Sequence, residues 1–330
     1  MTVASRKKAS TLIALLLGGL TPVLALAGCG GSSGASGATQ TSTSTTTTSS
    51  QPGSGRPPVT IGDKNFTEQF VLGELYSQAL QAQGFTVMVN RNIGSTEGTI
   101  QALTSGRLGM YPEYLGTWDT AVAGFKHSFR SPRAAYRAGQ DYAVAHGLQL
   151  LDLTRFSSTG AIAVTRAYAL GHELHGLEDL RNVAASLTVG APPQFQQSPT
   201  GLPLLEQVYG FVPAAFKSLL VGAQYQALDQ GVVQAAYAGS TDGQLTTGKY
   251  ALLRDPRHAF GWGNVVPIIS ARVLRAEGPA FRATIDRVSA LLTTRVMRQL
   301  NAAVDVSHQD PTAVAKQFLQ AHGLLRSGAA

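Results

Sequence analysis

Residues 59–89 read VTIGDKNFTEQFVLGELYSQALQAQGFTVMV. The first three residues are rich in β-branched side chains, which is typical of a strand. A helix is predicted from about Thr67, because apolar side chains recur every three to four residues until Gly84 supplies a stop. Apolar residues then alternate over 85–89, which is the period of a second strand. The stretch therefore predicts a strand, a helix and a strand in succession.

The same alternation continues along the chain. Ser95, Ser131 before Pro132, and Asp310 before Pro311 are typical helix starts. We expect further strands near residues 108–111, 148–153, 161–165, 187–191, 218–221, 232–237, 250–254 and 264–270, and helices near 202–209, 225–230, 279–292, 294–301 and 311–322. This order predicts an α/β protein with largely parallel sheets.

The length of this region indicates two lobes rather than one. About 270 residues follow position 58, and this exceeds what one hydrophobic core usually serves. We expect residues 59–165 to form the first part of lobe 1, residues 166–262 to form lobe 2, and residues 263–330 to return to lobe 1. A ligand cleft between the lobes is the natural binding site of such a protein.

The N-terminus is typical of an export signal. Arg6, Lys7 and Lys8 precede an apolar run over residues 11–27, so residues 1–28 are predicted to be a signal peptide. The run ends in Leu-Ala-Gly-Cys at residues 26–29, which resembles the lipobox of bacterial lipoproteins. That resemblance implies lipidation of Cys29, the only cysteine, and a place on the extracytoplasmic face of the cell membrane. An ordinary secretory signal with a chance cysteine, or an uncleaved membrane helix, are the alternatives.

Composition excludes several other classes of function. Residues 29–58 hold only Gly, Ser, Thr, Ala, Gln and Pro apart from Cys29 and Arg56, so we expect a disordered tether. The chain carries 26 Lys and Arg against 19 Asp and Glu, a formal charge of +7 that falls to +4 without the three basic residues of the signal. This excess is too small and too scattered to indicate a nucleic-acid partner.

No catalytic or metal motif stands out. His172 and His175 are three residues apart and lack the His-Glu-x-x-His spacing. Asp119, Asp152 and Glu206 are scattered carboxylates, which are usually solvated surface groups. We therefore expect no enzyme activity, no metal and no cofactor.

Three strings near the start of the folded region have a recognisable order. They are IGDKNFTEQ at residues 61–69, GSTE at 94–97 and YPEYLGT at 111–117. With GAPPQF at 190–195 and Tyr237 before STDG at 240–243, they resemble the glycine betaine/carnitine/choline-binding proteins of osmoprotectant ABC importers. The resemblance extends from Val59 to Leu325.

This resemblance implies a type II periplasmic-binding-protein fold, with two α/β lobes, a ligand cleft and two hinge crossings. It also implies a small compatible solute or quaternary ammonium ligand, partnership with ABC permease and ATPase subunits, and a monomer. A quaternary ammonium has no N–H group to donate, so aromatic faces must hold it. The predicted ligand-binding residues, by position or by proximity, are Asn65, Phe66, Gln69, Tyr114, Thr117, Tyr237 and Trp262.

Departures from the family pattern bear on the ligand. Gly160 and Gly263 stand where the family has two further cage tyrosines, and Trp262 is close enough in sequence to replace one of them. Ser198 stands where an arginine pairs the carboxylate of betaine or carnitine, and Thr200 replaces a nearby aspartate. Serine cannot form that bidentate contact. The departures favour a choline-like cation over glycine betaine.

Other interpretations remain open for these residues. Tyr114 and Tyr237 are packed aromatics in the simplest alternative, Asn65 and Thr67 could cap the first helix, and Asp242-Gly243 is typical of a turn. A ligand-sensing module on the same fold, or a secreted hydrolase on a similar scaffold, are the alternative functions.

Overall fold

The computed structural model describes residues 50–220 and 222–325. They contain two five-stranded sheets, with strand orders β2-β1-β3-β10-β4 and β7-β6-β8-β5-β9. The first sheet consists of β1 (Val59–Gly62), β2 (Val87–Asn90), β3 (Met110–Tyr114), β4 (Leu148–Leu150) and β10 (Val265–Ser270). The second consists of β5 (Gly160–Thr165), β6 (Thr188–Ala191), β7 (Ala215–Ser218), β8 (Ala235–Gly239) and β9 (Tyr250–Leu252). The predicted signal peptide, Cys29 and most of the predicted tether lie outside the described residues.

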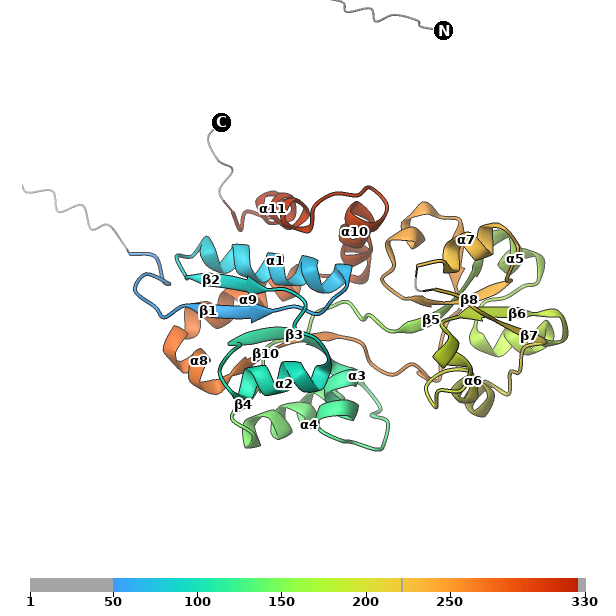
Figure 1. Ribbon diagram of the computed structural model, residues 1–330, viewed down its shortest axis with the longest axis horizontal. Coiled ribbons are helices and arrows are strands. Elements are labelled where there is room, and N and C mark those ends of the chain that lie inside the picture. Colours follow the sequence, from blue (N-terminus) through green and yellow to red (C-terminus); the bar gives the residue numbers. More distant parts are fainter. Residues whose placement is uncertain (1–49, 221, 326–330) are drawn as a thin grey trace, which may run out of the picture. The chain divides into compact units, whose positions relative to one another are not determined.

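Helices cover these sheets (Figure 1). Those associated with the first sheet are α1 (Thr67–Gln81), α2 (Thr96–Thr104), α3 (Leu115–Thr117), α4 (Pro132–Ala145), α8 (Ala271–Glu277), α9 (Pro279–Leu291), α10 (Thr294–Asp305) and α11 (Pro311–Ala321), with a π-helical turn at Trp118–Val122. The second sheet carries α5 (Arg166–Gly171), α6 (Leu202–Tyr209) and α7 (Gln224–Asp229). Short 3₁₀ helices occupy Leu177–Asn182, Ala184–Ser186, Pro193–Gln196 and Gly243–Thr247. None of the helices among the described residues is long and apolar enough to cross a bilayer.

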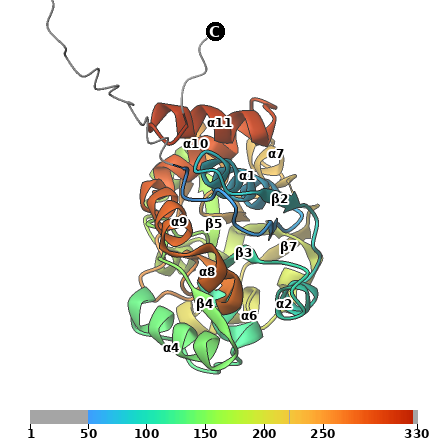
Figure 2. The same ribbon diagram turned by 90° about the vertical axis from the view of Figure 1, so that its left-hand side faces the viewer.

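The first sheet separates two hydrophobic cores. Val265 and Ile269 of β10 pack into the core with α1 and α9, whereas Val266 and Ile268 pack into the core with α2 and α4. Figure 2 shows α9 and α4 on opposite sides of this sheet. Successive side chains of a strand point to opposite faces of the sheet, and β10 is apolar at nearly every position. Both faces of the sheet are therefore covered by helices.

Each sheet is largely parallel, as predicted, and becomes mixed through one strand that runs in the opposite direction. β1 is parallel to β2 and β3, but β10 is antiparallel to β3 and β4. In the second sheet β6 is parallel to β7 and β8, but β5 is antiparallel to β8 and β9. The antiparallel strands are those that follow directly after the chain passes from one sheet to the other. The predicted α/β fold with two lobes is confirmed.

The boundary expected after residue 165 lies earlier. β5, at residues 160–165, was expected in lobe 1, but it pairs with β8 and β9 of the second sheet. The sheets are joined by two crossings that touch each other at Ser157 and Asn264, which form an isolated antiparallel bridge. This boundary depends on strand pairing between segments that are distant in the sequence, and local sequence patterns do not predict such pairing.

Residues 50–58 differ from a disordered tether. The backbone N–H of Gly53 donates to the carbonyl of Gln83 at 2.9 Å, and Arg56 Nη1 donates to the carbonyl of Ala276 at 2.7 Å. A side chain at position 53 would collide with the backbone of Phe85, whose nitrogen would lie 2.2 Å from the Cβ. A glycine in the polar segment thus lets the chain lie against the first lobe, which its composition alone did not indicate.

Candidate functional site

The turn between β1 and α1 is fixed by a buried glutamine. Gln69 is fully buried, donates from Nε2 to the carbonyl of Pro112 at 3.0 Å, and accepts from the N–H of Lys64 at 3.3 Å. Its amide therefore positions the turn against the end of β3. Neighbouring Asn65 is exposed, and Phe66 is 44% exposed.

The helix that follows this turn has no side-chain cap. Phe66 is the N-cap residue of α1 and makes no capping hydrogen bond with its side chain. Thr67 Oγ1 instead donates to Asp305 Oδ1 of α10 at 2.6 Å. The capping role considered for Asn65 and Thr67 is therefore not observed, because the hydroxyl of Thr67 is used to hold α10.

A buried ion pair supports the same turn. Lys64 Nζ lies 2.7 Å from Glu113 Oε2, and the Glu113 side chain is fully buried. Lys64 also donates to Thr96 Oγ1 at 3.0 Å, and Tyr111 donates to Glu113 at 3.2 Å. The charge of Lys64 is thus paired inside the first lobe.

Two of the predicted aromatic residues form a pair at the edge of the first lobe. The rings of Phe66 and Tyr114 have centroids 6.0 Å apart and planes tilted by 30°. Tyr114 Oη donates to Glu68 Oε1 at 2.9 Å. Burial and then the Glu68 carboxylate hold the pKa of Tyr114 well above its usual value, so the phenol stays protonated and acts as the donor.

Glu68 connects both lobes through hydrogen bonds. Asn301 Nδ2 of α10 donates to Glu68 Oε2 at 3.0 Å and to the carbonyl of Thr241 at 2.9 Å. Thr241 Oγ1 lies 2.8 Å from Ser158 Oγ on the first crossing. Burial raises the pKa of Glu68, while hydrogen bonds from Thr241, Asn301, Tyr114 and Ser158 act in the opposite direction.

A cavity of about 500 Å³ lies beside Glu68 and its partner Asn301. Phe66, Glu68 and Asn301 line it from the first lobe and α10, and Thr241 and Asp242 line it from the second lobe. Asp305 is the third carboxylate of this lining, and no lysine or arginine belongs to it. The side-chain oxygen Oδ1 of Asn301 is buried and has no hydrogen-bond partner among the described residues. The cavity is therefore acidic and has an aromatic ring at its edge.

Tyr237 lies in a second aromatic group, on the second sheet. Its ring centroid is 4.6 Å from that of Phe195 and 6.1 Å from that of Phe260. A Cβ at Gly160 would lie 2.8 Å from Tyr237 Cε2 and Oη. Gly160 therefore leaves the space that the Tyr237 ring occupies. Among the described residues Tyr237 forms no ring pair with Tyr114, since each packs on the core of its own lobe.

The other departures from the family pattern lie at different places. A Cβ at Gly263 would lie 1.9 Å from the carbonyl oxygen of Ser158, so the close contact of the two crossings requires glycine there. Ser198 is in a loop of the second lobe, where its Oγ lies 2.9 Å from Thr200 Oγ1. The two hydroxyl groups form a hydrogen bond with each other, and neither residue carries a positive charge that could pair with a ligand carboxylate.

The remaining predicted residues are not gathered with the aromatic pair. Thr117 is half-buried at the end of α3. Trp262 lines a separate pocket with Asp119 and Phe129, and none of the other predicted ligand-binding residues lines that pocket. The structure thus brings Phe66 and Tyr114 together and leaves Tyr237 and Trp262 in two other groups.

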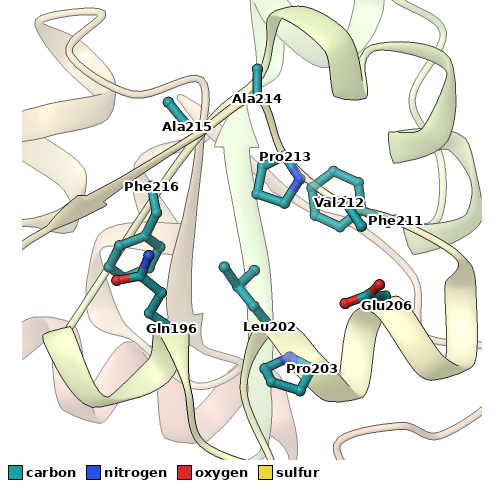
Figure 3. Close-up of a pocket in the computed structure, with 10 residues that line it drawn as sticks. All are labelled: Gln196, Leu202, Pro203, Glu206, Phe211, Val212, Pro213, Ala214, Ala215 and Phe216. Carbon is teal, nitrogen blue, oxygen red and sulfur yellow. The ribbon is translucent and has the colours of Figure 1, made fainter.

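A further pocket, shown in Figure 3, is confined to the second lobe. Its lining comes from α6, where Glu206 is the only charged residue, and from residues 211–216 and Gln196. None of the predicted ligand-binding residues lines it. Glu206 therefore lies apart from the aromatic groups described above.

Sequence reasoning missed the acidic residues of the cavity. Glu68 lies within the string at residues 61–69 but received no role, and Asp242 was interpreted as part of a turn. The N–H of Asp242 does close a turn on the carbonyl of Gly239 at 3.1 Å, and its carboxylate also accepts hydrogen bonds from Tyr225 Oη at 2.8 Å and the N–H of Gly239 at 2.9 Å. One sequence feature could have indicated the role of Glu68: it is a carboxylate two residues after Phe66, in the first turn of a helix predicted to begin at the cleft.

Comparison with known proteins gives a consistent result. A profile of the family described as the substrate binding domain of ABC-type glycine betaine transport systems matches residues 57–321. The chain is 32% identical over 283 residues to a glycine-betaine-binding protein of Pseudomonas aeruginosa, covering 82% of this chain and 90% of that protein. It is 28% identical over 289 residues to the glycine betaine-binding protein YehZ of Escherichia coli, covering 83% and 93%. A solved glycine betaine/carnitine/choline ABC transporter structure has a similar fold, with a TM-score of 0.75 at 23% identity over 81% of this chain and 99% of that one.

Proposed function

The chain belongs to the family of substrate-binding domains of ABC-type glycine betaine transport systems, and within this family we propose that its ligand is a choline-like cation rather than glycine betaine. The protein is the substrate-binding component of a glycine betaine/carnitine/choline ABC importer, not an enzyme. It binds a small solute and works with permease and ATPase subunits. The proposal concerns which solute it takes and which residues hold it.

The acidic lining of the 500 Å³ cavity is the observation that carries the proposal. Glu68, Asp242 and Asp305 line it together with Phe66, and none of its lining residues is basic. A carboxylate within a few ångströms attracts a cation strongly in a partly buried site. The same carboxylates repel the carboxylate of betaine or carnitine, so the cavity favours a cation that carries no acid group.

Aromatic faces supply the second part of the recognition. Each ring placed over a quaternary ammonium contributes roughly 0.5 to 2 kcal/mol. Phe66 and Tyr114 offer two faces on the first lobe, and Tyr237 with Phe260 offers two on the second lobe. We propose that ligand binding favours a closed form in which the two groups approach the same cation, with Asn65 and Thr117 at its margin. Gln69 acts by holding the turn that carries Phe66.

The loss of the expected arginine supports the same ligand class. A bidentate arginine is the usual partner of a ligand carboxylate. Ser198 stands at its position and is bonded to Thr200. Glycine betaine would therefore bring a carboxylate for which the loop offers only hydroxyl groups.

Cys29 is proposed to anchor the protein to the outer face of the cell membrane through a lipid. Residues 50–58, further along the chain, are held on the first lobe by hydrogen bonds. Substitution Cys29→Ser should move the protein from the membrane fraction to the soluble fraction. Continued sedimentation with lipid would rule out lipid anchoring through this cysteine.

The ligand proposal is tested by calorimetric titration of the full-length protein with choline, glycine betaine and carnitine. We expect choline to bind most tightly, and Tyr114→Ala and Tyr237→Ala each to weaken it at least several-fold. Tyr168→Ala is the control, because Tyr168 of α5 packs against His172 with ring planes tilted by 44° and does not line the cavity. Tighter binding of glycine betaine than of choline would refute the ligand class, and unchanged choline binding in both variants would refute the aromatic site.

A further inference from the structure

The pocket that contains Trp262 has a volume of about 340 Å³ and three walls. They are residues 116–120, the loop 127–130 and residues 257–262. The N–H of Gly116 donates to the carbonyl of Trp262 at 2.8 Å, and Trp262 Nε1 donates to the carbonyl of Phe129 at 2.9 Å. These bonds fix the indole ring against the first lobe.

Asp119 is a buried carboxylate in this pocket that lacks a partner. It is 4% exposed, and its Oδ1 is buried without a hydrogen-bond partner among the residues that the structure describes. Oδ1 lies close over Gly139 of α4, where a Cβ would come within 2.8 Å. A buried carboxylate without a donor is costly, because it has lost its hydration and gained nothing in return.

Aromatic rings accompany this carboxylate. The ring of Trp262 packs against that of His258 with centroids 4.2 Å apart and planes tilted by 36°, and Phe129 lies against Phe125 at 5.4 Å. Since the only N–H of the indole is used by Phe129, the ring offers a ligand its π-face alone. Such a face attracts a cation or packs against an apolar group.

We propose that this pocket is a second ligand site, which binds a small protonated primary amine with an apolar body. The ammonium donates N–H bonds to Asp119, and the apolar body packs between Trp262 and Phe129. This chemistry differs from that of the site with Phe66 and Tyr114, where the ligand needs no N–H group. The second site is independent of the ligand proposed for the main site.

The basic groups at the rim do not pair with Asp119. Arg130 is exposed to solvent, so its charge is screened. The guanidinium of Arg257 lies 5.3 Å from the centre of the Tyr209 ring and donates to the carbonyl of Val208. Burial alone raises the pKa of Asp119 to about 7, and a bound ammonium supplies the positive charge that favours its ionised form.

The experiment is calorimetric titration of the full-length protein with n-butylamine, and with tetramethylammonium as a probe of similar charge without N–H groups. We expect saturable binding of butylamine, weakened at least tenfold by Asp119→Asn and several-fold by Trp262→Leu. Asp141→Asn, which removes an exposed carboxylate from α4, should bind butylamine as the natural protein does. Thermal melting of each variant checks that it is folded.

Tyr114→Ala separates this site from the main one. Choline binding should fall in that variant while butylamine binding persists, whether or not choline is the natural ligand of the main site. No butylamine binding to the natural protein would overturn the second site. Equal binding in Asp119→Asn, equal binding of tetramethylammonium at the same residues, or joint loss of choline and butylamine binding in Tyr114→Ala would overturn it as well.

Discussion

Tyr114 and Glu68 are joined by a hydrogen bond of 2.9 Å from the phenol Oη to Oε1. The bond links the aromatic face at the edge of β3 to a buried carboxylate, and Asn301 links that carboxylate onward to Thr241 of the second lobe. The ring proposed to contact the cation is therefore oriented by the same group that connects the two lobes.

Replacement of Glu68 by glutamine tests the charge of this group without changing its shape. We expect Glu68→Gln to weaken choline binding about tenfold, which corresponds to roughly 1.4 kcal/mol. The melting temperature reports separately on the hydrogen bonds, because glutamine replaces one of the two accepting oxygens, Oε1 or Oε2, with an NH2 group. Calorimetry and thermal melting measure the two effects, with exposed Glu97→Gln of α2 as the control. Unchanged affinity would remove Glu68 from ligand recognition.

The affinity for a cation should depend on pH in a defined direction. Burial raises the pKa of Glu68, and burial also raises that of Asp242. Asp305 lines the same cavity, Tyr114 and Asn301 donate hydrogen bonds to Glu68, and Thr241 and Ser158 line the cavity with it. Since a proton and a cationic ligand compete for these carboxylates, choline should bind more tightly at about pH 8 than at about pH 5. Titration at both pH values measures this, and a reversed dependence would contradict an acidic site. The slope should shrink in Glu68→Gln.

Local signals predicted many of the helices well. Ser131 and Asp310 cap α4 and α11 as expected, and α6 spans the predicted residues 202–209. Each of these depends on neighbours within one turn of helix. Helix α1, in contrast, begins without the side-chain cap suggested by Asn65 and Thr67, because Thr67 bonds to α10.

Long-range partners could not be predicted from the same patterns. The bond between Asn301 and Glu68 joins residues 233 positions apart, and Thr241 reaches Ser158 across 83 positions. No local sequence pattern predicts that polar residues at such separations are in contact. The aromatic residues of the site were found only through resemblance to a family, and the acidic residues beside them came from the structure.

Asp63 should make the stability of the fold depend on pH. Its side chain is fully buried, with neither carboxylate oxygen hydrogen-bonded within the described part of the chain. Burial raises its pKa from 3.8 to about 7, Glu74 acts in the same direction, and Arg91 and the N–H of Asn92 oppose the shift. Between these pKa values the folded state keeps a proton that the unfolded state has released. The free energy of unfolding should therefore fall as pH rises from about 4 to about 7, by up to ~1.4 kcal/mol per unit.

The substitution Asp63→Asn should flatten part of this dependence. Asp119, whose pKa burial also raises to about 7, contributes in the same sense and remains in the variant. Urea unfolding at several pH values measures the slope, and exposed Asp141→Asn serves as the control. An unchanged slope in Asp63→Asn would show that Asp63 does not hold its proton in the folded state.

Gly160 offers the sharpest test of the Tyr237 face. A Cβ at this position would lie 2.8 Å from Cε2 and Oη of Tyr237 and 3.0 Å from Phe260, so Gly160→Ala must displace the tyrosine ring. We expect choline affinity to fall several-fold. The cost in unfolding free energy should be about 1 to 3 kcal/mol, as for other overpacked sites. Gly171→Ala is the matched control, because a Cβ there meets no atom within 4 Å. Since the two variants add the same methyl group to the same lobe, a loss of affinity confined to Gly160→Ala assigns the effect to the pair of rings of Tyr237 and Phe260. Equal affinities would instead place the second-lobe contact with the cation elsewhere than on these two rings.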